Sequence, residues 1–283
     1  MNTIRSIGEL RSALAQPRRE ARTIGLVPTM GALHEGHLSL LRRAREQCDL
    51  VVMSLFVNPS QFNEAADLAA YPRDELRDAR LAEQAGVDFV FAPSAEEMYP
   101  AGFATTVSVA GVTETLEGVH RGRSHFDGVA TVVTKLLNIV APDVAYFGQK
   151  DAQQAIVIRR LVSDLDIPVR IEVCPTVREP DGLAMSSRNV LLSGDQRTGA
   201  PSLHRALHAV ADAIAAGERD PVAARKLALA ELTSPELEVE YLELVSPDTL
   251  VPLQRLDGDA LAVVAARVGS TRLIDNELID GRR

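Results

Sequence analysis

Residues 23–57 read TIGLVPTMGALHEGHLSLLRRAREQCDLVVMSLFV, and this stretch contains the strongest evidence for the fold. Its two ends, 23–28 and 50–57, are apolar runs of the kind that form buried strands. Between them, apolar side chains recur at helical spacing from His37 to Gln47, at Leu38, Leu41, Ala44 and the adjoining Cys48. A strand, a helix and a second strand in this order predict a parallel βαβ unit.

The same alternation continues to about residue 175. We expect further strands at 87–92, 143–147 and 169–174, and further helices at 127–141 and Asp151–Ser163. Strands that alternate with helices favour a parallel sheet. Residues 1–176 are therefore predicted to form a Rossmann-like, doubly wound domain of the α/β class.

The pattern changes after Asp181. Helical patterns follow at Ser193–Ala216 and Pro221–Leu232, and strand-like runs follow at 237–245 and 260–266. These segments predict a smaller C-terminal α+β domain over residues 177–283. The turn at 178–182, Arg-Glu-Pro-Asp-Gly, is the expected hinge because Pro and Asp-Gly interrupt regular structure.

Composition narrows the class of protein. With 46% hydrophobic and 24% charged residues, the 283-residue chain has the balance of a folded globular protein. The net charge of -9 argues against general nucleic-acid binding, which depends on clustered Lys and Arg. We find neither a signal peptide nor an apolar run of about 18 residues, so a cytoplasmic protein without membrane association is expected. Cys48 and Cys174 lie in apolar runs without CxxC spacing, which predicts buried, reduced thiols.

The loop after the first strand is the first candidate site. It places glycines, backbone N–H groups and the imidazoles of His34 and His37 before a helix, an arrangement that suits phosphate. An ordinary loop with surface histidines is the alternative, and for an isolated HxxH it is the commoner case. A zinc protease is disfavoured, because HExxH requires two residues between the Glu and the second His and only Gly36 stands there.

Two further segments contain side chains that could bind parts of a nucleotide. Gly148-Gln149-Lys150-Asp151 follows another strand, where Lys150 could bind a phosphate and Asp151 a ribose hydroxyl, or Asp151 could simply cap a helix beside a solvated lysine. Met185-Ser186-Ser187-Arg188 follows the expected hinge, and its hydroxyls and guanidinium could bind a triphosphate. Ligands bind at the carboxyl ends of strands in open α/β sheets, so the three segments together favour a nucleotide site.

Eight blocks of sequence extend this pattern over nearly the whole chain. They are PTMGALHEGH (28–37), FVNPSQF (56–62), YPR (71–73), FVFAPSAEEMYP (89–100), HFDGVATVV (125–133), FGQKDAQQ (147–154), PTVREPDGLAMSSRN (175–189) and TRLIDN (271–276). In these blocks the chain resembles the pantothenate synthetase family of the nucleotidyltransferase superfamily. The HxGH and Ser-rich elements of that family parallel those of class I aminoacyl-tRNA synthetases.

The resemblance implies an ATP-dependent ligase. Pantoate would react with ATP to give an enzyme-bound pantoyl adenylate and pyrophosphate, and β-alanine would then displace AMP to give pantothenate. Adenylation converts a poor acyl donor into one with a good leaving group, so catalysis depends on orientation and on stabilising charge at phosphorus. Mg²⁺ would accompany ATP, held mainly by its phosphates, with no dedicated metal site on the protein.

The resemblance also implies roles for individual residues. His37, with His34 and Lys150, would be catalytic, and His37 would be the proton donor. Gln61 and Gln154 would hold pantoate, and Gln61 would also border β-alanine. The smaller domain would act as a lid, and a homodimer would form through the amino-terminal domain. The ATP site would comprise Met30, Gly31, Ala32, Leu33, His34, Glu35, Gly36, His37, Gly148, Gln149, Lys150, Asp151, Val177, Met185, Ser186, Ser187 and Arg188.

Some matching positions leave their roles open. Asn58, Tyr71 and Arg73 either touch pantoate or shape the loop over it. The family's Arg-Pro-Gly-His-Phe is replaced by the one-residue-longer 121–126, so Arg121 and Arg123 both compete for the arginine role. The segment 63–68 lacks the usual glycine, and Val190-Leu191 replaces a frequent Arg-Tyr pair.

Three alternatives compete with the ligase. Another nucleotidylyltransferase of the superfamily would share the HxGH loop but act on a phosphate-bearing acceptor, whereas the Gln61 and Gln154 pair favours a hydroxy acid. A tRNA synthetase would need an anticodon-binding extension. A non-catalytic nucleotide sensor would not need to retain both histidines, Lys150 and the Ser-Ser-Arg segment.

Overall fold

The computed structural model describes residues 1–63, 68–69 and 71–281. The chain divides into two compact units. The first comprises Met1–Gly148 and Val157–Cys174, and the second comprises Gln149–Ile156 and Pro175–Arg283. The last boundary lies close to the expected one at 176/177. The grouping of Gln149–Ile156 with the C-terminal unit was not predicted.

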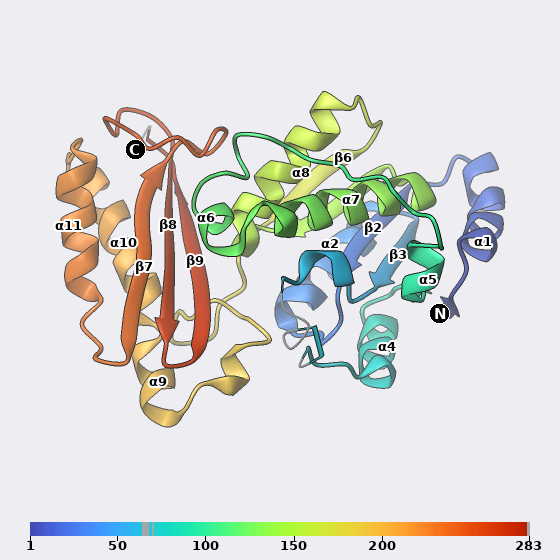
Figure 1. The fold of residues 1–283 in the computed structure, drawn as a ribbon, viewed down its shortest axis with the longest axis horizontal. Coiled ribbons are helices and arrows are strands. Elements are labelled where there is room, and N and C mark those ends of the chain that lie inside the picture. Colours follow the sequence, from blue (N-terminus) through green and yellow to red (C-terminus); the bar gives the residue numbers. More distant parts are fainter. Residues whose placement is uncertain (64–67, 70, 282–283) are drawn as a thin grey trace. The chain divides into compact units, whose positions relative to one another are not determined.

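The first unit is built on a six-stranded parallel sheet (Figure 1), as the βαβ pattern predicts. Its strand order is β1-β4-β3-β2-β5-β6, so the order reverses between β2 and β5, the switch point at which doubly wound sheets bind ligands. The strands are β1 (Asn2–Ile4), β2 (Ile24–Thr29), β3 (Leu50–Leu55), β4 (Phe89–Phe91), β5 (Val144–Gly148) and β6 (Arg170–Cys174).

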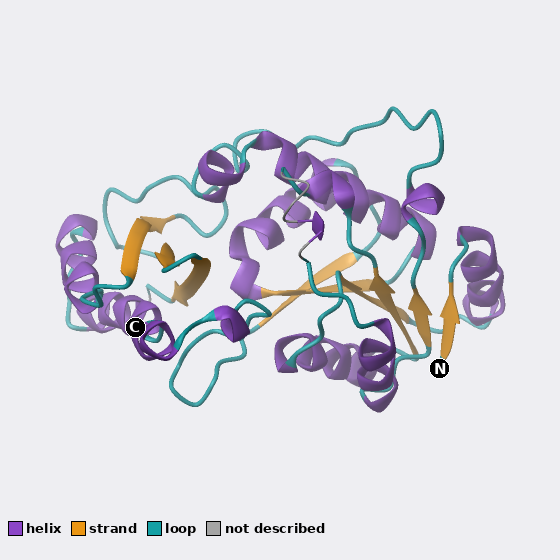
Figure 2. Cartoon of the chain, turned by 60° about the horizontal axis from the view of Figure 1, so that its bottom comes forward, coloured by secondary structure: helices purple, strands orange, loops and turns teal. Residues whose placement is uncertain are grey.

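Helices cover both faces of this sheet (Figure 2). On one face, α1 (Ile7–Arg19) and α7 (Arg123–Val140) pack with Leu26 and Val52 in one apolar cluster. On the other face, α2 (Glu35–Gln47) and α4 (Glu75–Gln84) pack with Val51 and Met53. Neighbouring residues of β3 therefore serve opposite faces, as the two-residue repeat of a strand requires. The first unit also contains α5 (Ala95–Met98) and α6 (Glu117–Arg121), and α8 (Ala152–Asp164) begins in the second unit and ends in the first.

A proline marks the carboxyl end of β2. The pairing of β2 with β5 is confined to Gly25–Val144 and Leu26–Ala145, whereas the pairing with β3 continues through Pro28 to Thr29. Proline has no N–H to donate to a second neighbouring strand. On the β5 side the pairing ends at Leu26, two residues before Pro28 and close to the start of the candidate phosphate loop.

The second unit packs helices against one three-stranded antiparallel sheet, β7 (Leu237–Val245), β8 (Ala260–Val268) and β9 (Thr271–Ile279). The core joins Leu207 and Val210 of α10 (Ser202–Ala215) and Ala228 of α11 (Pro221–Glu231) to the buried side chains of β8. This is the α+β pattern expected from the sequence.

Two details of the second unit differ from expectation. The helix expected over 193–216 is broken into α9 (Gly194–Gly199) and α10, because Pro201 cannot continue the hydrogen bonding of α9. The strand β9 was not predicted, because TRLIDNELI contains three charged residues and an asparagine among its apolar ones. Both Asp275 and Asn276 are nonetheless buried.

Both cysteines are buried, which confirms that part of the prediction, and both are free thiols in the structure. Cys48 Sγ lies 3.2 Å from the Tyr146 hydroxyl. Burial raises the pKa of Cys174 to about 11. No helix in the described part of the chain combines the length and apolar character needed to cross a bilayer.

We expect Cys174 to resist alkylation in the folded protein. A pKa raised from 9.0 to about 11 reduces the thiolate fraction near pH 8 by about 100-fold, and burial restricts access further. Iodoacetamide labelling followed by mass spectrometry measures this, with the urea-unfolded protein as the control. Equal labelling of Cys174 in the folded and unfolded protein would contradict the placement.

Candidate active site

The two histidines of the HxGH loop cap helix α2. His34 is the N-cap residue, and its Nδ1 accepts the Gly36 N–H at 3.1 Å. His37 Nδ1 accepts the His34 N–H at 3.4 Å. The ring centroids lie 4.2 Å apart with an interplanar angle of 48°. Two imidazoles are thus held together at the positive end of a helix dipole.

The cap fixes the tautomer of each neutral ring. A nitrogen that accepts a backbone N–H carries no proton, so each neutral imidazole has its proton on Nε2. Both rings are therefore set to donate through Nε2 while Nδ1 holds the backbone. This pair of rings is an arrangement suited to binding phosphate oxygens.

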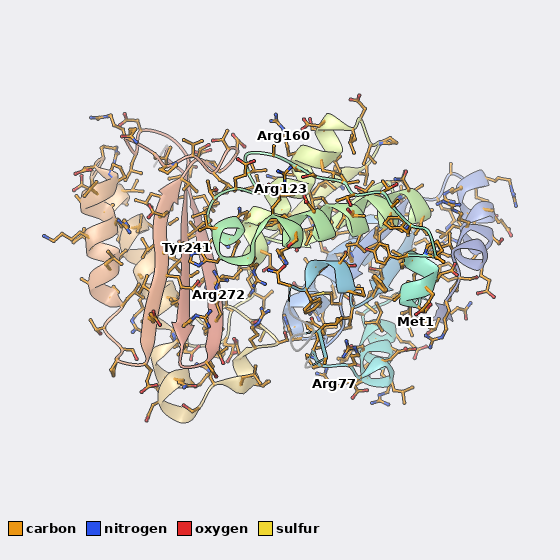
Figure 3. All side chains as sticks on the ribbon, in the orientation of Figure 1. Met1, Arg77, Arg123, Arg160, Tyr241 and Arg272 are labelled. Carbon is orange, nitrogen blue, oxygen red and sulfur yellow. The ribbon has the colours of Figure 1, made fainter. Side chains whose placement is uncertain are left out.

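A buried carboxylate holds the preceding part of the loop. Asp78, on α4, is 1% exposed, and its two oxygens accept the N–H groups of Ala32 and Leu33, each at 2.8 Å. Gly31 has φ +89, and a Cβ at this position would lie 2.9 Å from Asp78 Oδ2. The neighbouring Arg77 (Figure 3) donates to the Leu33 carbonyl at 3.1 Å. Neither residue was identified from the sequence, where both lie in an ordinary charged helix.

Asn58 organises the surroundings of Gln61. It is 1% exposed, and its Nδ2 donates to Gln61 Oε1 and to the Gly128 carbonyl, each at 3.1 Å. Its Oδ1 accepts the Tyr99 hydroxyl at 2.8 Å, and burial raises the pKa of Tyr99 so that this phenol stays protonated. The Gln61 Nε2 in turn lies 3.0 Å from Met30 Sδ. In the described structure Asn58 therefore orients Gln61 and shapes the loop.

Lys150 and Asp151 lie in a short 3-10 turn, η2 (Gln149–Asp151), before α8. The Lys150 side chain is 19% exposed, and its Nζ lies 3.4 Å from Asp151 Oδ1. Asn276 of β9 binds the turn: its Nδ2 donates to the carbonyls of Gln149 and Lys150. Gln154 lies in the first turn of α8 and is partly exposed.

The expected hinge is a braced hairpin. Arg178 pairs with Ala184 in an antiparallel bridge, and Met185 N–H donates to the Val177 carbonyl at 2.9 Å. The Arg178 guanidinium also binds Asp275 of β9 with contacts of 2.6 and 3.1 Å. A hydrogen bond from Arg197 lowers the pKa of Asp181 at the tip. Val177 and the segment 185–188 thus lie at the two ends of one hairpin.

The remaining positions that match or depart from the family pattern include Arg73, Arg121, Arg123 and the segment 63–68. Arg121 donates to the buried Glu117 at 2.8 Å, whereas Arg123 is 65% exposed and lies 3.9 Å from Asp127 (Figure 3). Arg73 donates to the Tyr71 carbonyl, so it braces its own segment. Residues 64–67 of the altered loop lie outside the described structure.

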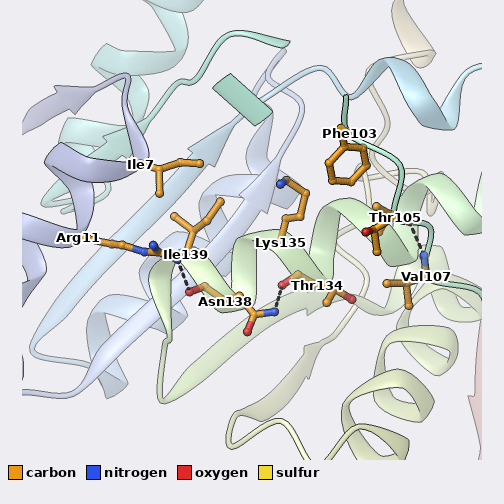
Figure 4. A pocket seen from close by; sticks show the side chains of 10 residues that line it. Ile7, Arg11, Phe103, Thr105, Val107, Thr134, Lys135, Asn138 and Ile139 are labelled. Atoms are coloured by element: carbon orange, nitrogen blue, oxygen red, sulfur yellow. Dashed lines mark hydrogen bonds between the residues drawn. The ribbon is translucent and has the colours of Figure 1, made fainter. Parts of the chain in front are cut away.

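A surface pocket in the first unit contains none of the predicted site residues (Figure 4). It lies between Ile7 of α1, Ile139 of α7 and the segment from Phe103 to Val107. Lys135 is among the residues that line it, with Nζ 4.8 Å from the centre of the Phe103 ring. Cation–π packing accounts for this lysine.

The predicted residues fall in both units. The loop 30–37, Gln61 and Gly148 belong to the first unit, and Gln149–Asp151, Gln154, Val177 and 185–188 belong to the second. The loop 30–37 follows β2, and Gln149 follows β5, its neighbour in the sheet. Both segments thus continue from carboxyl ends of strands at the switch point, where open sheets bind ligands.

A family model, a related sequence and two solved structures that are similar to this chain all belong to one protein family. The family model described as pantoate-beta-alanine ligase matches residues 2–278. The pantothenate synthetase of Moorella thermoacetica is 55% identical over 281 residues, 99% of each chain. The pantothenate synthetase structure from Thermus thermophilus has 49% identity and a TM-score of 0.93, covering 98% of this chain and 99% of that one. The structure of the pantoate-beta-alanine ligase from Francisella tularensis is described as complexed with beta-gamma ATP and beta-alanine. It has 34% identity and a TM-score of 0.81, covering 98% of this chain and 97% of that one.

Proposed function

The chain belongs to the pantoate-beta-alanine ligase family, and from this premise we propose how its residues divide the work of the reaction. As a member of that family, it joins pantoate to β-alanine at the expense of ATP and forms pantothenate. We assign some side chains to substrate binding and a smaller number to lowering the activation barrier of the reaction.

The reaction needs two displacements. In the first, a carboxylate oxygen of pantoate attacks the α-phosphorus of ATP, and the bond to the bridging oxygen breaks to release pyrophosphate. In the second, the amine of β-alanine attacks the acyl carbon of the adenylate, the bond to AMP breaks, and the nitrogen loses a proton. No enzyme nucleophile is required, so orientation and charge stabilisation account for catalysis.

His34 and His37 act on the departing pyrophosphate. The single observation that carries this role is the use of both Nδ1 atoms by the cap of α2, which places the protons on Nε2. Charge develops on the bridging oxygen as the bond to phosphorus breaks, and a donor at that point stabilises it. We assign proton donation to His37, which lies in the first turn of α2.

Lys150 binds the same phosphates, with Ser186, Ser187 and Arg188. An ammonium and a guanidinium match phosphate charge, and the hydroxyls donate to its oxygens. The remaining contacts to ATP are assigned to the loop 30–37, to Gly148–Asp151, and to Val177 and Met185. The support is that Val177 and Met185 are hydrogen-bonded across one hairpin, so their segments are positioned together.

Gln61 and Gln154 hold pantoate. An amide both donates and accepts, so it fits a hydroxyl and a carboxylate without adding charge. Because Asn58 occupies Gln61 Oε1, the Nε2 group of Gln61 is directed away from Asn58, toward Met30. This orientation supports donation from Gln61 to an oxygen of pantoate, with β-alanine bordering the same side chain.

Mg²⁺ enters with ATP as part of the substrate. The side chains proposed for the phosphates are imidazole, ammonium, guanidinium and hydroxyl groups, which pair with phosphate oxygens, so the phosphates and water hold the ion. When bound, it neutralises charge on the leaving pyrophosphate.

The cellular location, the oligomeric state and the partners of the enzyme are proposed from the same resemblance. We propose a cytoplasmic homodimer joined through the amino-terminal domain, with the C-terminal domain as a lid and without nucleic-acid or membrane partners. The family resemblance supports the dimer and the lid. The unpaired thiols of Cys48 and Cys174 fit a reducing compartment.

The proposal is tested with purified protein, pantoate, β-alanine, ATP and Mg²⁺. We expect AMP, pyrophosphate and pantothenate to appear in equal amounts, and exchange of labelled pyrophosphate into ATP to require pantoate. Release of ADP, or AMP formation that is independent of pantoate, would exclude the adenylate route. Transfer of AMP to a phosphate-bearing acceptor would favour another nucleotidylyltransferase.

A further inference from the structure

Asn276 is a buried asparagine in the middle of a strand. It lies on β9 opposite Val263 of β8 and is only 4% exposed. An amide at such a position costs free energy unless its donors and acceptor find partners. The hydrogen-bond partners of the Asn276 side chain therefore indicate the role of this residue.

The side chain of Asn276 is directed at the turn that carries Lys150. Nδ2 donates to the carbonyl oxygens of Gln149 and Lys150, each at 2.9 Å. Oδ1 accepts from Gln149 Nε2, also at 2.9 Å. This assignment of the amide is the only favourable one, because a flipped amide would place Oδ1 against two carbonyl oxygens. Three bonds from one side chain thus fix two consecutive residues.

The neighbouring Asp275 fastens the other nucleotide segment of the same unit. Successive residues of a strand point to opposite faces, so Asp275 is directed away from Asn276. It is 3% exposed, and both of its oxygens bind the Arg178 guanidinium. Arg178 also donates to the Gly182 carbonyl at 3.0 Å, which closes the hairpin between Val177 and Met185. The strand β9 is thereby anchored on both faces.

We propose that Asn276 is a positioning residue for adenylation, which holds the Gln149–Lys150 main chain so that the Lys150 ammonium is aimed at the phosphates. The inference rests on the proposed role of Lys150. Asparagine is required because two carbonyls need two donors on one side chain. An aspartate of the same size would bring negative charge to those carbonyls and release the turn.

The test is single-turnover adenylation in the variants N276A and N276D of the full-length protein, each also combined with K150A. We expect N276D to slow pyrophosphate release by about 10- to 100-fold, because small misplacements of a catalytic group have effects of this size. We expect N276A to be slowed less, because it adds no charge. In the K150A background N276D should change the rate by less than about twofold, since the two residues act through one interaction.

A matched control separates positioning from loss of stability. Thr271 is 5% exposed on the same strand, and T271V perturbs buried β9 without touching the turn. We expect T271V to retain the normal rate. Reaction of β-alanine with preformed pantoyl adenylate should also be unchanged in N276D and N276A.

The outcomes separate the inference from the proposed function. If K150A slows adenylation but neither Asn276 variant does, or if N276D has the same effect with and without Lys150, the positioning role is wrong. If K150A itself leaves adenylation unchanged, the assigned role of Lys150 is wrong and the inference falls with it. If N276D does not fold, the same criteria apply to N276A.

Discussion

Replacement of His37 by alanine is expected to slow pantoyl-adenylate formation by about 10²- to 10⁴-fold, the range typical of a lost proton donor. The ring provides the only proposed proton for the bridging oxygen of the leaving pyrophosphate. The cap bond from the His34 N–H is also lost, which costs about 1 kcal/mol of stability, so the folded protein should persist. The affinity for ATP should change by less than about tenfold, because Lys150 and Arg188 still bind the phosphates.

Rapid-quench measurement of both half-reactions tests this prediction. Reaction of β-alanine with preformed pantoyl adenylate should proceed at nearly the normal rate in His37→Ala, since pyrophosphate has already left. His208→Ala is the control, because His208 is an exposed histidine of α10 that lies 3.9 Å from Asp212 and 3.7 Å from Glu277. An unchanged adenylation rate in His37→Ala would exclude the assigned role.

Replacement of Asp78 by asparagine should have the second largest effect. One of the two carboxylate oxygens becomes an amide donor, so the N–H of Ala32 or Leu33 loses its acceptor inside the protein. A buried unpaired donor costs about 1–3 kcal/mol, which should appear as a lower free energy of unfolding. The loop that leads to His34 is no longer fixed, and adenylation should fall by about 10²-fold.

Asp49→Asn provides the matched control for Asp78. Asp49 accepts the Thr23 N–H and hydroxyl, each at 2.8 Å, so it also holds a loop with two bonds, but at the amino ends of β2 and β3. The Thr23 backbone hydrogen bond lowers the pKa of Asp49, so the charged form is the one that binds. Urea unfolding and single-turnover kinetics should show reduced stability in both variants and slow adenylation only in Asp78→Asn. Equal rates in the two variants would show that the Asp78 contacts do not serve catalysis.

The sequence predicted those elements whose side-chain pattern records their own burial. Strands β2, β3 and β5 and helices α2 and α7 have apolar residues at the spacing of their secondary structure, so their positions were found to within a few residues. The strand β9 was missed for the opposite reason. Its Asp275 and Asn276 are buried because they hydrogen-bond to distant segments. From the local sequence pattern alone, such polar residues are expected to be exposed.

The chemistry of the site was visible in the sequence as residue types. His34, His37, Lys150 and the Ser-Ser-Arg segment are reactive or charged groups in glycine-containing loops, and their order along the chain matches a known family. The sequence did not show how these groups are held. Asp78 binds residues 45 and 46 positions away, and Asn276 binds residues 126 and 127 positions away.

The doubly wound sheet, the phosphate-binding residue types and the reaction they serve all follow from the order of amino acids in the chain. The orientation of those residues is set by the folded structure: the Nε2 tautomer of the HxGH pair, the buried acceptor for its loop, and the β9 anchor of the Lys150 turn. The physical reason is that periodicity and turn chemistry act between near neighbours in the chain. Hydrogen bonds to main-chain groups can come from any residue that folding brings within about 3 Å, and such a partner leaves no periodic signal.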